Sequence, residues 1–175
     1  MTDATKPDAA SPAPAPVMPM IEKRRIEAAM LKHVYDTLKE SHGKEVAQAT
    51  IGKAVRASAL EQARELAAAV GGRTSMQTFI DRQAQWRMGN ALETELVEQT
   101  PTTYAYNVTR CRYAEMYREM GLGEIGHLLS CMRDGTFAEG YDSRIRMTRT
   151  QTIMQGASHC DFRYRLVQPD KAETR

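Results

Sequence analysis

The sequence contains no long hydrophobic run. None of its apolar stretches approaches the roughly 18 residues that a membrane-spanning helix needs, and the N-terminus has no apolar signal-peptide core after its charged residues. The 175 residues carry a formal net charge of only +2, which is too weak a field to draw the protein to nucleic acid or to anionic lipid. We therefore expect neither a membrane nor a nucleic-acid partner.

Cysteine is scarce, and its count is odd. Cys111, Cys131 and Cys160 cannot all pair within the chain, and they lack the tight C-x-x-C spacing of a structural zinc site. Together with the missing secretion signal, the three cysteines predict free thiols in a reducing cytoplasm.

Proline is almost absent from the body of the chain. Five of the seven prolines fall within residues 1–20, a composition that cannot bury enough apolar surface to fold. The sequence predicts a disordered leader over 1–20, one domain over 21–168 and a flexible tail over 169–175. Because the chain is 42% hydrophobic, a domain of this length can bury a core.

The first half of the domain has helical periodicity. Residues 21–40 and 44–70 are separated by the breaker SHG, and a third helix opens after GGR with a capping box of Thr74 and Gln77. The apolar stripe of the first helix consists of Ile26, Met30, Val34 and Leu38. That of the second helix consists of Ala47, Ile51 and Val55 and then, after a phase shift, Leu60, Ala63, Leu66 and Val70. These stripes predict packing on a sheet or, alternatively, a homo-oligomer interface.

The period changes in the second half. Residues 91–99 and 103–111 predict two strands joined by a tight connection, and helical spacing returns over 113–132. Residues 144–154 and 159–167 predict two further strands. The expected fold class is α+β, with a helical N-terminal half packed on a small antiparallel sheet made of two β-hairpins separated by short helices.

The second of these strands ends in a cysteine. Asn107, Thr109 and Cys111 alternate along NVTRC and are expected to share one face. Because the strand runs into a helix, Cys111 is either a small buried hydrophobe or a thiol whose ionisation the helix dipole favours.

The segment HLLSCMRD carries three groups that can share a proton or a zinc ion. His127, Cys131 and Asp134 are spaced at i, i+4 and i+7, which places them on one face of an α-helix. The alternative is that His127 and Cys131 fill the inner face while Asp134 caps the following turn.

In RMTRTQT, an arginine interrupts an apolar face. Arg149 shares that face with Met147 and Ile153. It therefore needs an anion, either from the protein or from a substrate carboxylate. The opposite face is a ladder typical of the solvent side of a sheet. It consists of Arg146, Thr148, Thr150 and Thr152.

The stretch SHCDFRYR alternates charged and apolar residues. Its apolar face consists of Cys160, Phe162 and Tyr164. His159 and Asp161 point to the other face of the strand and are therefore not the base that would activate Cys160. Any such partner must come from another element, and HLLSCMRD is the available one. Cys160 itself is a core thiol, a metal ligand or a nucleophile.

Together these segments resemble the L-2-amino-thiazoline-4-carboxylic acid hydrolase family of bacteria. The resemblance covers about residues 85–166 and rests on six elements in order. They are Cys111 after a strand, the Gly121-Leu122 break, Cys131 with Asp134, the run Arg149-Thr150-Gln151-Thr152, Gly156, and the run from Cys160 to Tyr164.

The resemblance implies hydrolytic opening of a small nitrogen-containing ring, either a cyclic amidine or a lactam-like compound. Water must add to an sp² carbon, which requires a nucleophile, an acid for the leaving nitrogen and donors for the developing charge. The implied nucleophile is Cys160. The other candidate catalytic residues are Cys131, Asp134, Cys111 and, from its place beside them on the helix rather than from the family pattern, His127. The candidate substrate-binding residues are Arg149, Arg163, Asn107 and Thr150.

Two alternatives to a thiol hydrolase stay open. No cofactor is required by the thiol mechanism, but the three cysteines could instead bind zinc or manganese that activates water. The module could also bind a small ligand as a sensor, without catalysis. In each case the expected partner is a small molecule.

Overall fold

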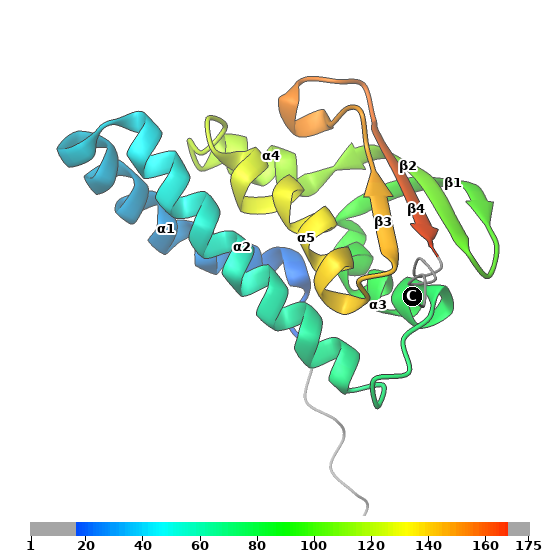
Figure 1. The fold of residues 1–175 in the computed structure, drawn as a ribbon. Coiled ribbons are helices and arrows are strands. Elements are labelled where there is room, and N and C mark those ends of the chain that lie inside the picture. Colours follow the sequence, from blue (N-terminus) through cyan, green and yellow to red (C-terminus); the bar gives the residue numbers. More distant parts are fainter. Residues whose placement is uncertain (1–16, 168–175) are drawn as a thin grey trace, which may run out of the picture.

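The computed structural model describes residues 17–167, so most of the predicted leader and all of the predicted tail lie outside the described residues. The elements are α1 (Met20–His42), α2 (Lys44–Ala68), α3 (Met76–Arg87), β1 (Leu92–Gln99), β2 (Thr103–Cys111), α4 (Arg112–Glu119), a π-helix (His127–Cys131), α5 (Met132–Tyr141), β3 (Ile145–Thr148) and β4 (Cys160–Leu166). The predicted α+β class is confirmed (Figure 1). Within residues 17–167, none of the helices combines the length and the hydropathy that a membrane span requires.

The four strands form one antiparallel sheet in the order β1-β2-β4-β3. Helices α3 and α5 pack against it, and α2 lies against the other side of α5 (Figure 1). Aromatic rings fill the space between helices and sheet. The Phe79 ring of α3 lies 5.0 Å from that of Tyr164 in β4 and 5.7 Å from that of Tyr141 in α5. Helix α1 is the outermost layer beside α2.

The start of α3 differs from the prediction by one residue. The capping box consists of Ser75 and Thr78, because the Ser75 hydroxyl accepts the Thr78 N–H at 3.1 Å and Thr78 Oγ1 accepts the Ser75 N–H at 2.9 Å. The predicted cap, Thr74 with Gln77, is wrong. The Thr74 hydroxyl instead donates to Asp142 at 2.8 Å, which ties the start of α3 to the end of α5.

The predicted strand over 144–154 is also too long, since β3 ends at Thr148. The Asp161 carboxylate accepts the backbone N–H groups of Thr150 and Gln151 at 3.0 and 2.9 Å. These side-chain acceptors replace the ladder hydrogen bonds that a longer strand would make. The chain then turns through a short 3-10 helix, Ile153–Gln155, before β4 begins.

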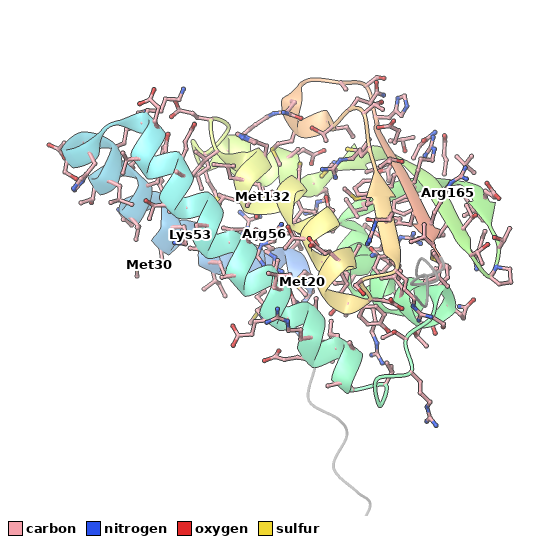
Figure 2. The ribbon with its side chains drawn as sticks, in the orientation of Figure 1. Met20, Met30, Lys53, Arg56, Met132 and Arg165 are labelled. Atoms are coloured by element: carbon pink, nitrogen blue, oxygen red, sulfur yellow. The ribbon has the colours of Figure 1, made fainter. Side chains whose placement is uncertain are left out.

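The apolar stripe predicted for the first helix does not face the sheet. Ile26, Met30 and Val34 are 63%, 68% and 40% exposed, and Met30 points away from the helix pair in Figure 2. The buried side of α1 instead carries Arg24 and Ala28, among others. In α2 the buried line keeps a spacing of four without the predicted phase shift. It consists of Ala47, Ile51, Val55, Ala59 and Ala63.

The core has two parts that meet along one seam. One part gathers side chains of α1, α2, α4 and the π-helix. The other gathers the aromatic side chains of α3, α5 and the sheet. Four side chains pack against both parts. They are Trp86, Leu92, Cys111 and Ile153. Three of the four also line the candidate site.

Candidate functional site

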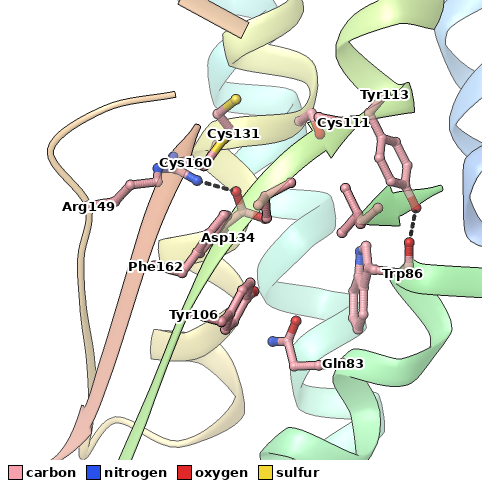
Figure 3. A pocket seen from close by; sticks show the side chains of 13 residues that line it. Gln83, Trp86, Tyr106, Cys111, Tyr113, Cys131, Asp134, Arg149, Cys160 and Phe162 are labelled. Atoms are coloured by element: carbon pink, nitrogen blue, oxygen red, sulfur yellow. Dashed lines mark hydrogen bonds and ion pairs between the residues drawn. The ribbon is translucent and has the colours of Figure 1, made fainter. Parts of the chain in front are cut away.

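A cavity of about 50 Å³ lies at the seam between the two cores (Figure 3). It brings together five of the nine residues that the sequence predicted for the site. These are Cys111, Cys131, Asp134, Arg149 and Cys160. The remaining wall is mostly apolar or aromatic. It consists of Gln83, Trp86, Leu92, Tyr106, Val108, Tyr113, Ser130 and Phe162.

A β-bulge turns Cys111 into the cavity. Glu93 of β1 pairs with Arg110, and the next residue, Thr94, pairs with Val108, so Thr109 is an extra residue in β2. One extra residue shifts the side-chain alternation. Cys111 therefore lines the cavity together with Val108. The predicted common face of Cys111 and Thr109 is wrong, since Thr109 is exposed.

The π-helix sets the position of Cys131 and Asp134. The Met132 N–H donates to the His127 carbonyl, a bond that spans five residues instead of four. A π turn holds more residues than an α turn, so each residue advances by a smaller angle. The π turn therefore rotates His127 relative to Asp134, and His127 does not line the cavity. The predicted shared face of these three residues is not formed.

The anion that Arg149 was predicted to need is provided by Asp134. Arg149 Nη1 donates to Asp134 Oδ2 at 2.5 Å, and Nη2 donates to the Cys131 carbonyl at 2.9 Å. The guanidinium also lies 4.8 Å from the centre of the Phe162 ring. Only 10% of the Arg149 side chain is exposed, and these contacts fix its guanidinium at the wall of the cavity.

Burial keeps all three cysteines in the thiol form at neutral pH. It raises the pKa of Cys111 to about 11 and that of Cys131 to about 12. At Cys111 the N–H groups of the first turn of α4 oppose this effect but do not outweigh it. Burial also raises the pKa of Cys160, against the Ile153 N–H, which donates to its sulfur at 3.2 Å, and the positive charge of Arg149. Cys160 thus has two neighbours that favour a thiolate.

Asp134 has two opposing influences on its protonation. Burial raises the pKa of this carboxyl group, and the charge and hydrogen bond of Arg149 lower it, with the net direction upward. A carboxyl group with a raised pKa accepts a proton more readily than an ordinary aspartate does.

The other four predicted residues lie outside the cavity. Arg163 donates to Asn107 Oδ1 at 3.0 Å on the opposite face of the sheet. The Thr150 hydroxyl donates to Asp161 at 2.7 Å, and His127 does not line the cavity. Within the described part of the chain, no three side chains of His, Cys, Asp or Glu converge to hold one metal ion.

Sequence patterns did not single out several wall residues. Gln83 and Trp86 come from α3, and the Tyr113 hydroxyl donates to the Trp86 carbonyl at 3.1 Å, which ties α4 to α3 (Figure 3). Trp86 lies at helical spacing from the other apolar residues of α3, so its inward position could be found from the sequence. Gln83 has no such signal, because a glutamine in a helix is usually solvated.

Comparisons with known proteins identify a family and a solved structure of similar fold. The family model described as L-2-amino-thiazoline-4-carboxylic acid hydrolase matches residues 23–164. No curated protein matches the chain. Among solved structures, the phenol-responsive sensory domain of the transcription activator PoxR, determined with phenol, is similar with a TM-score of 0.50 and 13% sequence identity, over 84% of this chain and 82% of that one.

Proposed function

Because the chain belongs to the L-2-amino-thiazoline-4-carboxylic acid hydrolase family, we propose that it is a hydrolase that opens a small nitrogen-containing ring at a cyclic amidine or lactam-like C–N bond. The observation that carries the proposal is the gathering of three thiols, a carboxyl group and a guanidinium around one cavity. Such a reaction needs a nucleophile, a group that moves a proton and a cation near the developing charge. In the cavity, a thiol can be the nucleophile, the carboxyl group can move the proton, and the guanidinium is the cation.

Cys160 is the proposed nucleophile. Its sulfur accepts the Ile153 N–H and feels the positive charge of Arg149, and both stabilise the thiolate that attacks. Cys131 has a pKa of about 12, which burial raises, so it stays protonated. Cys111 and Cys131 then serve as polarizable walls for the ring.

Asp134 is the proposed proton carrier. It takes the thiol proton as the Cys160 sulfur adds to the sp² ring carbon. The addition moves the electron pair of the double bond onto the neighbouring atom, and Arg149 stabilises the negative charge that develops there. When the intermediate collapses, the ring C–N bond breaks and the nitrogen leaves with the proton from Asp134. Water then adds to the carbon bound to sulfur, and the Cys160 thiol is released. The sum of these steps is hydrolysis of one C–N bond.

A metal-dependent version of the same hydrolysis is the first alternative. Thiolates favour zinc, and three cysteines line one cavity. The lack of a convergent ligand group among residues 17–167 means that the side chains would have to move to bind an ion. For this reason the thiol mechanism ranks first.

A non-enzymatic sensor is the second alternative, and the shared fold with a phenol-responsive sensory domain supports it. In that case the chain would bind a small ring compound and release it unchanged. We place the protein in the cytoplasm, since all three cysteines are free. The exposed residues Ile26, Met30 and Val34 offer a surface for a homo-oligomer.

The decisive experiment is a hydrolysis assay on a panel of five-membered cyclic amidines, lactams and imides, with and without a chelator. We expect turnover that survives the chelator and is abolished in Cys160→Ser without loss of folding. Ser158→Ala, an exposed hydroxyl in the same segment, is the matched control. Near wild-type turnover in Cys160→Ser would end the nucleophile proposal. Turnover lost with chelator and restored by zinc or manganese would favour the metal version, and ligand returned unchanged would favour the sensor.

A further inference from the structure

A second, smaller cavity of about 10 Å³ lies beside the first, within the helical layer. Gln83, Trp86 and Asp134 line both cavities. The rest of the second wall consists of Arg24, Ala59, Gln62, Arg133 and Phe137. It is therefore formed by four helices, α1, α2, α3 and α5, and it contains two arginines.

Both arginines are buried, but their hydrogen bonds are unequal. Arg24, 4% exposed, donates through Nη1 to both oxygens of Glu27 at 2.9 and 2.7 Å and through Nη2 to Gln62 at 2.9 Å. Arg133, 9% exposed, reaches Glu27 only at 3.4 Å and donates through Nε to the Leu129 carbonyl. Its buried Nη1 has no partner among the described residues. One strong donor is thus left unused.

Positive charge is in excess around this cavity. The charged side chains that line this cavity are Arg24, Arg133 and Asp134, and Glu27 pairs with both arginines from outside it. Two cations and one anion thus form its wall, and Asp134 is itself paired with Arg149, so the wall favours an added anion. Burial, followed by the neighbouring Arg24, lowers the pKa of Arg133 to about 10, and Glu27 and Asp134 offset this only in part.

We infer that the second cavity is the binding site for the carboxylate of the small molecule, with Arg133 as its main anchor, while the ring occupies the first cavity. This inference rests on the proposed function for the identity of the ring, but the anion site stands on the arginines alone. It also resolves the question of the carboxylate anchor. Arg149 is already paired with Asp134, and Arg163 lies on the far face of the sheet.

The two cavities adjoin along a shared wall, as the sites for a ring and for its acid group would. A volume of about 50 Å³ holds only a few water molecules, and 10 Å³ holds less than one, so binding requires the shared wall to move aside. The side chain of Gln83 makes no hydrogen bond within residues 17–167 and can rotate without losing one. On the solvent side of Arg24, the exposed Glu61 and Glu65 line a separate depression, which disfavours an approach of the anion from there.

A carboxylate on Arg133 would also act on the proposed chemistry. Asp134 lines both cavities, so the new negative charge would lie close to it. A nearby anion favours the protonated form of a carboxyl group. Substrate binding would therefore strengthen Asp134 as the acceptor of the Cys160 proton, which couples recognition of the acid to catalysis.

The test compares matched ligands that differ only in the acid. The probes are 2-amino-2-thiazoline with and without its 4-carboxylate, and 2-pyrrolidinone with and without its 5-carboxylate. Binding is measured by calorimetry on the Cys160→Ser variant, in which turnover is removed. The same measurement is made on the double variant that also carries Arg133→Met. Arg56→Met is the control, because Arg56 lies on the same α2–α5 contact, bonds Glu139 at 3.0 Å and lines neither cavity.

We expect at least one carboxylate probe to bind more tightly than its neutral partner, and Arg133→Met to weaken it about 10- to 100-fold. The affinity for the neutral probes should not change with Arg133→Met. The affinity for the carboxylate probes should not change with Arg56→Met. Arg133→Met should still fold, because Glu27 keeps both of its bonds to Arg24, and thermal unfolding of the variant checks this. Carboxylate binding that is equal to neutral binding, unaffected by Arg133→Met or absent for every probe would overturn the inference. Carboxylate selectivity without turnover in the wild type would refute the hydrolase and leave the anion site intact.

Discussion

The ion pair between Arg149 and Asp134 gives the sharpest prediction about the site. Arg149→Met keeps a side chain of similar length but removes the bond to Asp134 Oδ2 at 2.5 Å and the bond to the Cys131 carbonyl at 2.9 Å. Asp134 is then left as a buried carboxylate without its main counter-charge. The variant should be clearly less stable than the wild type at neutral pH.

The size of the loss follows from burial. Removing one partner of a buried ion pair costs about 3–5 kcal/mol. Because 28% of the Asp134 side chain remains exposed, we expect the lower end, about 3 kcal/mol. For a chain of this size, that corresponds to a decrease in Tm of about 6–12 °C.

The loss should also depend on pH in a defined direction. Burial already raises the pKa of Asp134, and without Arg149 it rises further. A carboxyl group whose pKa is higher in the folded state favours folding while it is protonated. Its penalty is absent below its unfolded pKa of about 3.9 and grows as pH rises through the folded pKa. Arg149→Met should therefore lose less stability at pH 4 than at pH 7.

Urea unfolding followed by circular dichroism at both pH values measures these differences. Asp134→Asn in the Arg149→Met background should recover most of the loss, because it removes the unpaired charge. Arg56→Met, which breaks an ion pair about half exposed on both sides, should cost less than about 1 kcal/mol. A loss below about 1 kcal/mol for Arg149→Met, or an equal loss at both pH values, would refute the reasoning.

Three further predictions concern the thiols, a helix contact and a surface cluster. Since burial raises the pKa of each thiol, iodoacetamide at pH 7 should label the native protein far more slowly than the urea-unfolded protein, as counted by mass spectrometry; fast native labelling would contradict this. Gly140→Val should lower stability by about 1–3 kcal/mol, because even a Cβ there would lie 3.0 Å from the Ala63 Cβ, whereas Gly123→Ala should be tolerated. Lys39 and its neighbours lower the pKa of Glu124 to about 2, so the Tm difference between wild type and Glu124→Gln should be present above pH 5 and vanish as pH falls toward 2; a constant difference would exclude this role.

Much of the fold could be predicted from local patterns. The strand 103–111 was located at its correct bounds because tight turn residues precede it and alternating aromatic residues fill it. The helices up to residue 68 followed from apolar spacing. The inward face of α1 could not be predicted this way. Arg24 is buried there because Glu27 and Gln62 bond it, and apolar periodicity does not register such a paired charge.

The candidate site was predicted in part for a similar reason. Cys160 could be placed because β4 is a regular strand with a strict alternation. The strand face of Cys111 and the position of His127 were predicted wrongly, because a bulge and a π turn each change the count of residues along an element by one. Neither leaves a composition signal. The pairing of Arg149 with Asp134 joins residues fifteen apart through a loop, and only the tertiary structure specifies it.

The position of the cavity at the seam has a consequence for how the protein responds to any ligand. A molecule bound there contacts Trp86 and Cys111, which pack against both cores. It would therefore add contacts between the two parts of the core. Hydrogen exchange should then slow across both halves at once, far beyond the contact residues. A hydrolase and a sensor would share this property, because in either case binding of the ligand would make the whole fold more rigid.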